Sequence, residues 1–411
     1  MTVMQSDIAI TGGGPVGLAA ALSLAENGLT VCVLEQAPES VWSSPSFDGR
    51  EIALTHHSRA LLEKIGAWSL LPEECISLLN EARIETGRNN EPLIFRAEED
   101  THEPLGWLVS NYAIRKSLWT LANAHPGITL LPDSSVTTIR RNPDAAVVHF
   151  QNGDTPRKLS ARLVIGADGR FSPTRRRAGI GAVIHDFHRT MMVCRMEHSE
   201  PHHNVALQWF DHGQTIAMLP VQGQASSLVL TLPTEKIRHL MNASVSDFDA
   251  EIMQRTGGRF GDMHLISSRH AYPMKTVFAH RFAAPRLALI GDAAVGMHPI
   301  TAHGFNLGLR AQEILSEEIG KAFARGEDIG SSPALRRFET RLRKITVPMF
   351  ATTNSIATLY TRDDGPFRIL RRAGLRLAGS VPPFKRAVTQ MLTEQERNNG
   401  LHTAFGGLLA V

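Results

Sequence analysis

The sequence is poor in cysteine and in aromatic residues, and it contains no long apolar run. Its three cysteines lie far apart at Cys32, Cys75 and Cys194 without C-x-x-C spacing, which argues against a disulfide framework and against a thiolate metal site. Aromatic residues make up only 6% of the chain and no familiar nucleic-acid-binding motif occurs, so we expect no nucleic-acid partner. The absence of any run of about 18 apolar residues argues against a membrane-spanning helix.

The beginning of the sequence also lacks the pattern of a secretion signal. The stretch DIAITGGG, which favours a strand and a turn, begins at Asp7 without a preceding basic segment and apolar core. We therefore expect a cytoplasmic protein. The 411 residues, of which 43% are hydrophobic and 20% charged, suffice for two globular domains.

Histidines cluster at two places, but neither has the spacing of a metal site. His56 and His57 are adjacent, and His198, His202 and His203 are irregularly spaced in HSEPHH. We interpret both clusters as surface segments and expect no bound metal.

Basic residues gather towards the end of the chain, although the net charge is only +3. Residues 336–386 hold 12 Lys/Arg against 3 Asp/Glu, which leaves 31 Lys/Arg against 37 Asp/Glu elsewhere. The arginines alternate with Leu, Ile and Phe at helical spacing, as in helices that bury one face. The cationic face has three interpretations: an ordinary solvated surface, a contact with anionic lipid, or a contact with an acidic protein.

The stretch DIAITGGGPVGLAAALSLAENGLTVCVLEQ predicts a strand, a tight turn, a helix and a second strand. Gly12, Gly14 and Gly17 form G-x-G-x-x-G directly after the first strand, and Glu35 ends the second strand 18 residues after Gly17. The first glycine permits the turn, the second lets the backbone approach a pyrophosphate, and the third lets the helix pack on the strand. The helix start offers free N–H groups, and Glu35 is placed to accept hydrogen bonds from a ribose. This motif predicts a dinucleotide site and leaves NAD and FAD open.

Two later segments each place a carboxylate at the end of an apolar strand. ARLVIGADGRFSPTRRRAGI carries Asp168 and Gly169, and RLALIGDAAVGMHPITAHGFNLGLR carries Gly291 and Asp292. Three such strand ends suit an extended ligand whose diphosphate and polyol chain cross the carboxyl edge of one sheet, which favours FAD. Taken singly, Asp168 is also compatible with a simple turn and Asp292 with a helix N-cap.

Together the three motifs resemble those of the group A flavin monooxygenases, the FAD-dependent aromatic hydroxylases related to p-hydroxybenzoate hydroxylase. The matching elements are G-x-G-x-x-G, G-A-D-G-x-x-S-x-x-R and G-D-A-A…P…G-x-N. DGREIALTHHSRALLEKIGAW and LGWLVSNYAIRKSLW are most similar to the ubiquinone-biosynthesis hydroxylases, and the tail LYTRDDGPFRILRRAGLRLAGSVPPFKR is similar to the branch that acts on demethoxyubiquinol. The resemblance covers nearly the whole chain and is weaker between residues 181 and 284.

The resemblance implies an α/β fold, in which a Rossmann-like FAD-binding domain of the glutathione-reductase type carries an inserted β-sheet substrate domain and C-terminal helices. The expected FAD-binding domain is discontinuous and comprises residues 1–75, 100–180 and 285–330. The expected substrate domain comprises residues 76–99 and 181–284. A helical C-terminal segment, residues 331–411, follows. NVALQWFDHGQTIAMLP and SSLVLTLP are expected to be strands of a sheet that covers the flavin. Trp209, Phe210, Met218 and Leu219 are the candidates for its apolar pocket, although strand alternation is equally compatible with ordinary core positions.

The same resemblance implies which residues bind FAD. Glu35 is expected at the ADP half, Arg50 at the diphosphate, Arg115 on the flavin side and Asp292 at the ribityl chain, and Asp168 is implicated in NAD(P)H use as well. The full expected set is Gly12, Gly14, Pro15, Val16, Gly17, Glu35, Arg50, Arg115, Asp168, Gly169, Gly291, Asp292, Pro299, Gly304, Phe305 and Asn306.

The implied reaction is hydroxylation of an aromatic ring. NAD(P)H reduces FAD, oxygen adds to give the flavin C4a-hydroperoxide, and an electron-rich ring attacks it. The chain contains no G-x-S-x-G elbow, H-E-x-x-H or P-loop lysine, so the bond-making chemistry must come from the flavin. The implied substrate is a polyprenylated ubiquinone precursor, with demethoxyubiquinol as the best match. Such a lipid-like substrate implies peripheral membrane contact through the basic C-terminal region, or delivery by other biosynthetic proteins.

Two positions depart from the family pattern. Val295 stands where histidine usually follows G-D-A-A, and His303 stands within Thr-Ala-His-Gly where Ala-Gly-Gln-Gly is usual. We treat Pro299 and His303 as candidate catalytic residues, with His303 tuning a proton step; an ordinary loop histidine is the alternative. Three other functions stay open: hydroxylation of a small soluble aromatic acid, reduction or halogenation by a flavoprotein, and a non-catalytic flavin-fold subunit of a biosynthetic complex.

Overall fold

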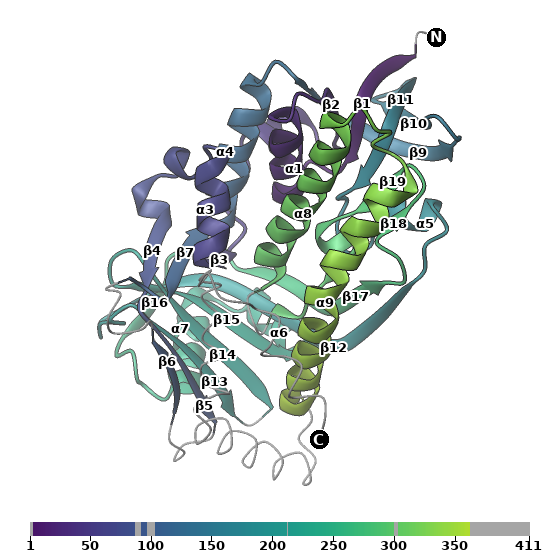
Figure 1. Ribbon diagram of the computed structural model, residues 1–411. Coiled ribbons are helices and arrows are strands. Elements are labelled where there is room, and N and C mark those ends of the chain that lie inside the picture. The colour runs from purple at the N-terminus through teal and green to yellow at the C-terminus, as the bar shows by residue number, and fades with distance from the viewer. Residues whose placement is uncertain (1–2, 87–91, 97–102, 212, 300–302, 362–411) are drawn as a thin grey trace.

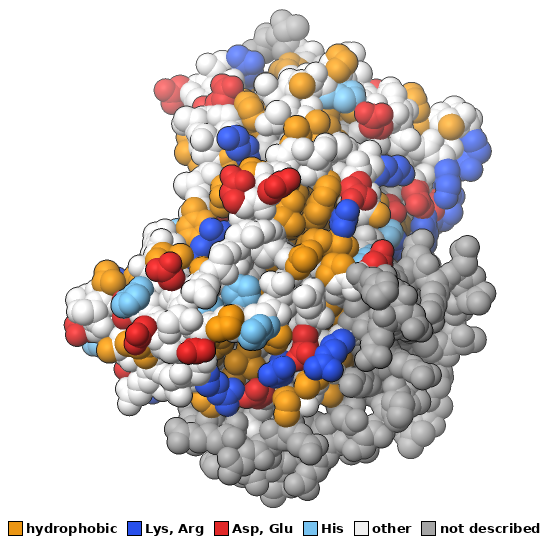
Figure 2. Space-filling view, turned by 90° about the vertical axis from the view of Figure 1, so that its left-hand side faces the viewer, with side chains coloured by type: hydrophobic (Ala, Val, Ile, Leu, Met, Phe, Trp, Pro, Cys, Tyr) orange, Lys and Arg blue, Asp and Glu red, His pale blue; other side chains and the backbone are white. Residues whose placement is uncertain are grey.

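The computed structural model describes residues 3–86, 92–96, 103–211, 213–299 and 303–361. Two large sheets dominate it, and long helices run from one sheet towards the other (Figure 1). Charges of both signs are interspersed with hydrophobic side chains on the face shown in Figure 2. Within the described ranges, no helix combines the length and the apolar character needed to span a bilayer.

The first sheet has eight strands and a parallel centre, with the order β18-β19-β11-β1-β2-β8 and with β10 and β9 joined to it through β11. Its strands are β1 Met4–Thr11, β2 Val31–Leu34, β8 Ile128–Leu131, β9 Ser134–Arg141, β10 Ala146–Asn152, β11 Thr155–Gly166, β18 Ala283–Ala284 and β19 Leu287–Leu289. Strands β1, β2, β8, β11 and β19 pair in parallel. The side chains of β2 are buried on both faces, so other elements cover both sides of this strand.

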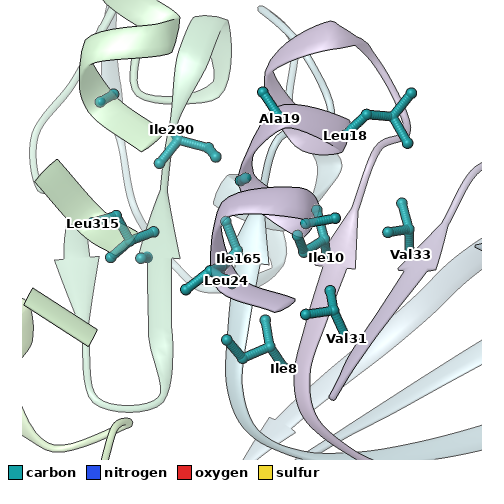
Figure 3. Packing of buried hydrophobic residues seen from close by; sticks show 14 of the residues in the cluster. Ile8, Ile10, Leu18, Ala19, Leu24, Val31, Val33, Ile165, Ile290 and Leu315 are labelled. Atoms are coloured by element: carbon teal, nitrogen blue, oxygen red, sulfur yellow. The ribbon is translucent and has the colours of Figure 1, made fainter. Parts of the chain in front are cut away.

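Helix α1 (Pro15–Ala25) connects β1 to β2 and packs against helices α4 (Asn111–Ala124) and α8 (Gly304–Ala324). It consists largely of Ala and Leu and is buried over most of its surface, because neighbours surround it. Figure 3 shows Leu18 and Leu24 of α1 beside strand residues such as Ile10 and Ile165, with Leu315 of α8 nearby. This arrangement places the glycine turn before α1 at the carboxyl edge of the sheet.

Helix α9 (Ser332–Thr361) packs along α8. Two of its arginines, Arg337 and Arg341, bond to Glu318 of α8 over 2.7 Å and 2.8 Å, and Arg343 bonds to Glu339 over 2.8 Å. These arginines of the predicted basic segment therefore take part in helix packing. The rest of that segment, from residue 362 onwards, lies outside the described residues.

A three-stranded sheet of order β3-β7-β4 is formed by segments that connect strands of the two large sheets along the chain. Short helices and turns accompany it. These elements are α2 Glu39–Ser43, β3 Glu51–Leu54, α3 His56–Lys64, η1 Trp68–Leu70, η2 Glu73–Cys75, β4 Ile76–Leu79 and β7 Gly106–Ser110.

The second large sheet has nine strands in the order β20-β17-β12-β15-β14-β13-β5-β6, with β16 joined to β12. Its strands are β5 Glu81–Thr86, β6 Leu93–Arg96, β12 Ala182–His198, β13 Val205–Asp211, β14 Gln214–Val221, β15 Ala225–Pro233, β16 Met263–Leu265, β17 His270–Ala279 and β20 Val295–Gly296. The strands predicted from NVALQWFDHGQTIAMLP and SSLVLTLP are confirmed as β13, β14 and β15.

Two helices, α6 (Thr234–Asn242) and α7 (Val245–Thr256), cover the outer face of this sheet and form a second hydrophobic core with it. Strand pairing crosses the predicted domain boundaries at two points. Strand β4 pairs with β7 instead of the substrate sheet, and β20 pairs with β17 of that sheet. The division into domains otherwise stays a prediction.

Candidate functional site

The glycine turn before α1 is shaped by close backbone contacts and leaves one position open. Gly12 has φ of 101°, and a Cβ there would lie 2.5 Å from the carbonyl oxygen of Ala167. A Cβ on Gly17 would collide with the carbonyl oxygen of Gly12. A Cβ on Gly14, in contrast, would meet nothing within 4 Å, and Pro15 follows it as the first residue of α1. The helix start is therefore accessible to an anionic group, as a pyrophosphate requires.

The three loops that carry the motifs meet at this edge of the sheet. The Ala167 N–H donates to Thr11 O over 2.8 Å, and the Ile290 N–H donates to Gly166 O over 3.0 Å. A Cβ on Gly291 would lie 3.3 Å from Cγ1 of Val16 in the first turn of α1. The carboxyl ends of β1, β11 and β19 thus converge on one place, where a single elongated ligand can contact all three.

Glu35, at the end of β2, points its carboxylate at the glycine turn. Its Oε2 accepts from the Gly13 N–H over 2.7 Å and its Oε1 from the Ala37 N–H over 2.9 Å. Trp42 donates from Nε1 to Gly13 O over 2.8 Å and fixes the same turn. A carboxylate has about four lone-pair sites, so Glu35 keeps acceptor capacity for ligand hydroxyls. Trp42 was missed from the sequence because it lies outside the recognised motifs.

Two arginines supply positive charge beside this turn. Arg50 bonds to Asp48 over 2.6 Å, and its guanidinium lies 5.4 Å from the ring centre of Tyr272. Arg115 is half-buried in α4 and makes no hydrogen bond or ion pair with any residue that the structure describes. Burial lowers the pKa of its guanidinium, while the Asp48 and Glu35 carboxylates oppose that shift. A half-buried cation without a direct partner fits a diphosphate or another anionic group of the ligand.

The loop after β11 uses the Asp168 carboxylate to hold its own shape. Oδ1 accepts a hydrogen bond from the Ser172 hydroxyl, and Oδ2 accepts from the Thr174 N–H over 2.8 Å at the start of α5 (Pro173–Arg177). The buried Arg175 then donates from Nη1 to Ala293 O over 2.9 Å, which joins this loop to the one after β19. Burial lowers the pKa of the Arg175 guanidinium. Asp168 therefore organises the loop, and its role towards FAD and NAD(P)H stays a prediction.

Asp292 lies in the 3-10 helix η3 (Gly291–Ala293) and is held by Arg170. Its Oδ2 accepts from Nε and Nη2 of Arg170 over 3.2 Å and 3.0 Å, and Nη1 of Arg170 donates to Lys275 O over 2.6 Å. Ile290 occupies the N-cap position, so the alternative of Asp292 as an N-cap is wrong. Arg170 stands at an unspecified position of the motif G-A-D-G-x-x-S-x-x-R, and its partner, 122 residues away, was not visible from the sequence.

The start of α8 is fixed through Asn306. Its Nδ2 donates to Ala53 O over 2.8 Å, and its Oδ1 accepts from the Thr55 N–H over 3.3 Å, which ties α8 to the end of β3. Phe305 packs against the main core, His303 is buried at the N-cap position, and a Cβ on Gly304 would meet nothing within 4 Å. Open space at this helix start leaves its N–H groups available to a ligand.

The loop before α8 carries Pro299, which is exposed, after His298, which is buried. Burial lowers the pKa of His298 to about 4, so this imidazole is neutral at physiological pH. Residues 300–302 lie outside the described part of the chain.

The pocket candidates separate onto the two faces of the second sheet. Trp209 and Met218 belong to the core beneath α6 and α7, on the outer face, so the prediction that they line the flavin pocket is wrong. Their neighbours Phe210 and Leu219 point to the opposite face by strand alternation. On that face a Cβ at Gly49 would lie 2.6 Å from Val193 of β12, which shows that it faces the nucleotide-binding part. Phe210 and Leu219 thus stay predicted pocket residues.

A buried ion pair joins this inner face to the three-stranded sheet. Arg195 of β12 bonds to Oε1 of Glu51 over 3.0 Å and 2.6 Å, and the Ser110 hydroxyl donates to Oε2 of Glu51 over 2.9 Å. Burial raises the pKa of Glu51, although the Arg195 charge acts in the opposite direction. The pair neutralises a cation on the inner face of the second sheet.

Away from this edge, the described residues form a cavity and no metal site. Among the described residues, no group of three or more His, Cys, Asp or Glu could hold a metal ion. A cavity of about 530 Å³ opens beside β5 and β13, where Glu81 bonds to Arg83 over 2.6 Å and to Arg96 over 2.6 Å. None of the predicted site residues lines it. The open helix starts, the Glu35 carboxylate and the partnerless Arg115 therefore remain the features that fit FAD.

The sequence matches the family model described as an FAD binding domain over residues 5–327. It is 41% identical to the ubiquinone hydroxylase UbiM of Neisseria meningitidis over 394 residues, which cover 95% of this chain and 85% of that protein. It is 31% identical to the 3-demethoxyubiquinol 3-hydroxylase of Escherichia coli over 388 residues, or 94% and 98% of the two chains. The fold is similar to that of p-nitrophenol 4-monooxygenase PnpA from Pseudomonas putida, with a TM-score of 0.75 at 19% identity over 97% and 100% of the two chains.

Proposed function

This chain belongs to the FAD-binding aromatic hydroxylases and, among them, to the ubiquinone hydroxylases, and from this membership we infer that it hydroxylates the aromatic ring of a ubiquinone precursor. The observation that carries the proposal is the convergence of the loops after β1, β11 and β19 at one sheet edge. When bound there, FAD supplies the activated oxygen that enters the ring.

The residues of the chain are assigned to the parts of FAD by their positions. The glycine turn and the start of α1 bind the diphosphate, with Arg50 and Arg115 supplying positive charge, and Glu35 accepts from the ribose hydroxyls. Asp292, oriented by Arg170, accepts from the ribityl hydroxyls. The start of α8 directs N–H groups at the flavin ring and stabilises negative charge on it.

We assign NAD(P)H as the reductant, because insertion of one oxygen atom from O2 requires two electrons. One oxygen atom replaces hydrogen as a ring hydroxyl, the other leaves as water, and NAD(P)H is oxidised to NAD(P)+. The sheet above the flavin must exclude water, so that activated oxygen reaches the substrate ring instead of being lost as hydrogen peroxide.

The substrate that fits best is a polyprenylated quinol such as demethoxyubiquinol. The alternative, a small aromatic acid, requires a fixed cation in the pocket to bind its carboxylate. Arg195 lies on the flavin-facing side of the sheet, but Glu51 neutralises it over 2.6 Å. This pairing favours an uncharged ring over an acid.

His303 is assigned a role in a proton step near the flavin, motivated by its buried position at the start of α8. His303→Gln should alter how the coupling of NAD(P)H oxidation to product formation depends on pH. Unchanged coupling across the pH range would leave His303 as an ordinary buried histidine.

The test of the proposed function uses the purified full-length chain. Bound FAD should be visible in its absorbance spectrum, and a short-chain demethoxyubiquinol analogue should stimulate NAD(P)H oxidation with formation of a product heavier by one oxygen atom. A colourless protein that cannot be reconstituted with FAD would remove the proposal. A flavoprotein whose NAD(P)H oxidation no quinol stimulates would instead support the alternative of a non-catalytic subunit.

A further inference from the structure

Two large hydrophobic side chains, Phe171 and Ile184, are exposed near the start of β12. Phe171 is 51% exposed and Ile184 52%, while Val183, at 56%, projects from the opposite face of the strand. Phe171 lies 5.9 Å from Nζ of Lys275, Lys275 bonds to Asp186 over 2.9 Å, and Asp186 stands two residues after Ile184 on the same strand. In Figure 1 α5 and the start of β12 lie at the right-hand edge of the molecule. Exposed apolar residues that gather in this way mark an interaction surface.

Several cations lie in the same part of the chain. Residues 169–189 and 275–286 together hold eight Lys/Arg; of these, Arg170, Lys275 and Arg286 pair with Asp292, Asp186 and Asp328, and Arg175 is buried. Arg176, Arg177 and Arg281 are exposed and form no ion pair with any described residue. Arg141 adds a further guanidinium, 3.3 Å from Ala178 O at the end of α5. We call this surface, defined by Phe171, Ile184, Arg176, Arg177 and Arg281, the β12 face.

The β12 face adjoins the candidate site. Arg170, which precedes Phe171, bonds to Asp292 over 3.0 Å. On the other side, the Phe187 ring lies 4.4 Å from His185 and 4.6 Å from the buried His298, which precedes Pro299. A bulge in β12 between Asp186 and Thr190 includes this segment, with φ of 52° at His188. Aromatic rings therefore connect this exposed segment of β12 to the buried His298 in the loop before α8.

We propose that the β12 face docks this chain onto the surface of an anionic lipid bilayer. Apolar side chains that enter the interface and arginines that meet lipid phosphates are the combination that peripheral membrane binding requires. The proposal rests on the proposed function, because a polyprenylated substrate resides in the bilayer. It assigns the contact to a surface beside the candidate site and not to the basic residues after position 361.

Vesicle binding of full-length, FAD-loaded protein tests this assignment. The vesicles consist of phosphatidylcholine with or without phosphatidylglycerol. The apolar variant F171S/I184S should bind at least tenfold more weakly to anionic vesicles, since each buried methylene contributes to insertion. The cationic variant R176Q/R177Q/R281Q should bind to anionic vesicles about a hundredfold more weakly, since each cation near an anionic surface contributes a factor of about five. High salt should weaken the wild type and have less effect on the cationic variant.

Two matched variants serve as controls. V245S/I266S removes apolar side chains that are 53% and 51% exposed elsewhere and should bind as the wild type does. R371Q/R372Q/R376Q removes three cations from the C-terminal basic segment. The assignment is overturned if both β12-face variants bind like the wild type, or if only the C-terminal variant loses binding.

Activity on a short-chain, water-soluble quinol separates this proposal from the proposed function. Both β12-face variants should keep their FAD and their turnover of that analogue, while turnover of a vesicle-borne substrate falls. Failure of the wild type to act on the soluble analogue would overturn the proposed function, whatever the vesicles bind.

Discussion

Replacement of Gly308 by alanine tests how closely α8 approaches the dinucleotide helix. A Cβ at position 308 would lie 2.5 Å from Cγ2 of Val16 in the first turn of α1. Non-bonded carbon atoms rest at about 3.5–4.0 Å, so the two helices would have to separate by roughly 1 Å. Since Val16 also lies against Gly291, that movement would displace the glycine turn from the loop after β19.

The expected cost follows from two opposing effects. Overpacking of this kind destabilises by about 1–3 kcal/mol. Alanine in a helix interior gains roughly 1 kcal/mol over glycine. Gly320→Ala in the same helix is the matched control, because its Cβ would meet only the exposed side chain of Asn27 at 3.0 Å, and that side chain can turn away. Gly308→Ala should therefore be less stable than Gly320→Ala by about 1–3 kcal/mol.

Denaturant unfolding and FAD titration by flavin fluorescence measure both consequences. Gly308→Ala should also bind FAD several-fold more weakly, whereas Gly320→Ala should bind it normally. Val16→Ala removes the methyl groups that collide, so the double variant V16A/G308A should be more stable than the sum of the single effects indicates. Equal stability of the two glycine variants, or additive behaviour of the double variant, would refute the reasoning.

Three further predictions concern other contacts. Arg170→Gln should lower FAD retention on gel filtration about tenfold because Asp292 loses two charge-assisted hydrogen bonds, and Arg170→Lys should not restore it because lysine lacks the planar fork. Burial opposes ionisation of Glu318, but its hydrogen bonds to two arginines of α9 prevail and lower its pKa from 4.5. The ion pairs of Glu318 therefore stabilise the folded state fully above pH 4.5, and this contribution is lost as the pH falls through the lowered pKa of the folded state. Glu318→Gln should lose roughly 1.5–3 kcal/mol at neutral pH and show a flatter dependence of the melting temperature between acidic and neutral pH; an unchanged acid transition would contradict this. Trp209→Ala should cost about 3–5 kcal/mol of stability with KM for a quinol unchanged, whereas Phe210→Ala should raise KM; the reverse pattern would show that the two faces of the sheet were assigned incorrectly.

The motifs predicted the nucleotide edge of the fold because each glycine and each carboxylate there follows from local backbone requirements. Gly12 needs a positive φ, Gly17 needs close packing, and Gly291 follows a buried strand, and all three conditions leave a pattern in the sequence. The contacts that these loops make with one another leave no such pattern in the sequence. Arg170 and Asp292 stand in separate motifs, and only the parallel pairing of β11 and β19 brings them within 3.0 Å.

The pocket could be predicted only in part, because β13 and β14 carry large apolar side chains on both of their faces. Alternation separates Trp209 and Met218 from Phe210 and Leu219, but it does not tell which set faces the helices. That choice depends on where α6 and α7 pack, which is a tertiary property. The helical interpretation of the basic segment was correct as far as Thr361, yet three of its arginines, Arg337, Arg341 and Arg343, bond to Glu317, Glu318 and Glu339 within the protein.

The two large sheets are built from alternating stretches of one chain. The first takes its strands from residues 4–34, 128–166 and 283–289, and the second from 81–96, 182–279 and 295–296. Removal of the segments that form one sheet would break the chain between strands of the other sheet. Neither sheet is therefore expected to fold as an independent fragment. A protease that nicks one connection should release no stable piece until the entire molecule gives way, and synthesis on the ribosome must reach β19 before the first sheet has all of its strands and β20 before the second does.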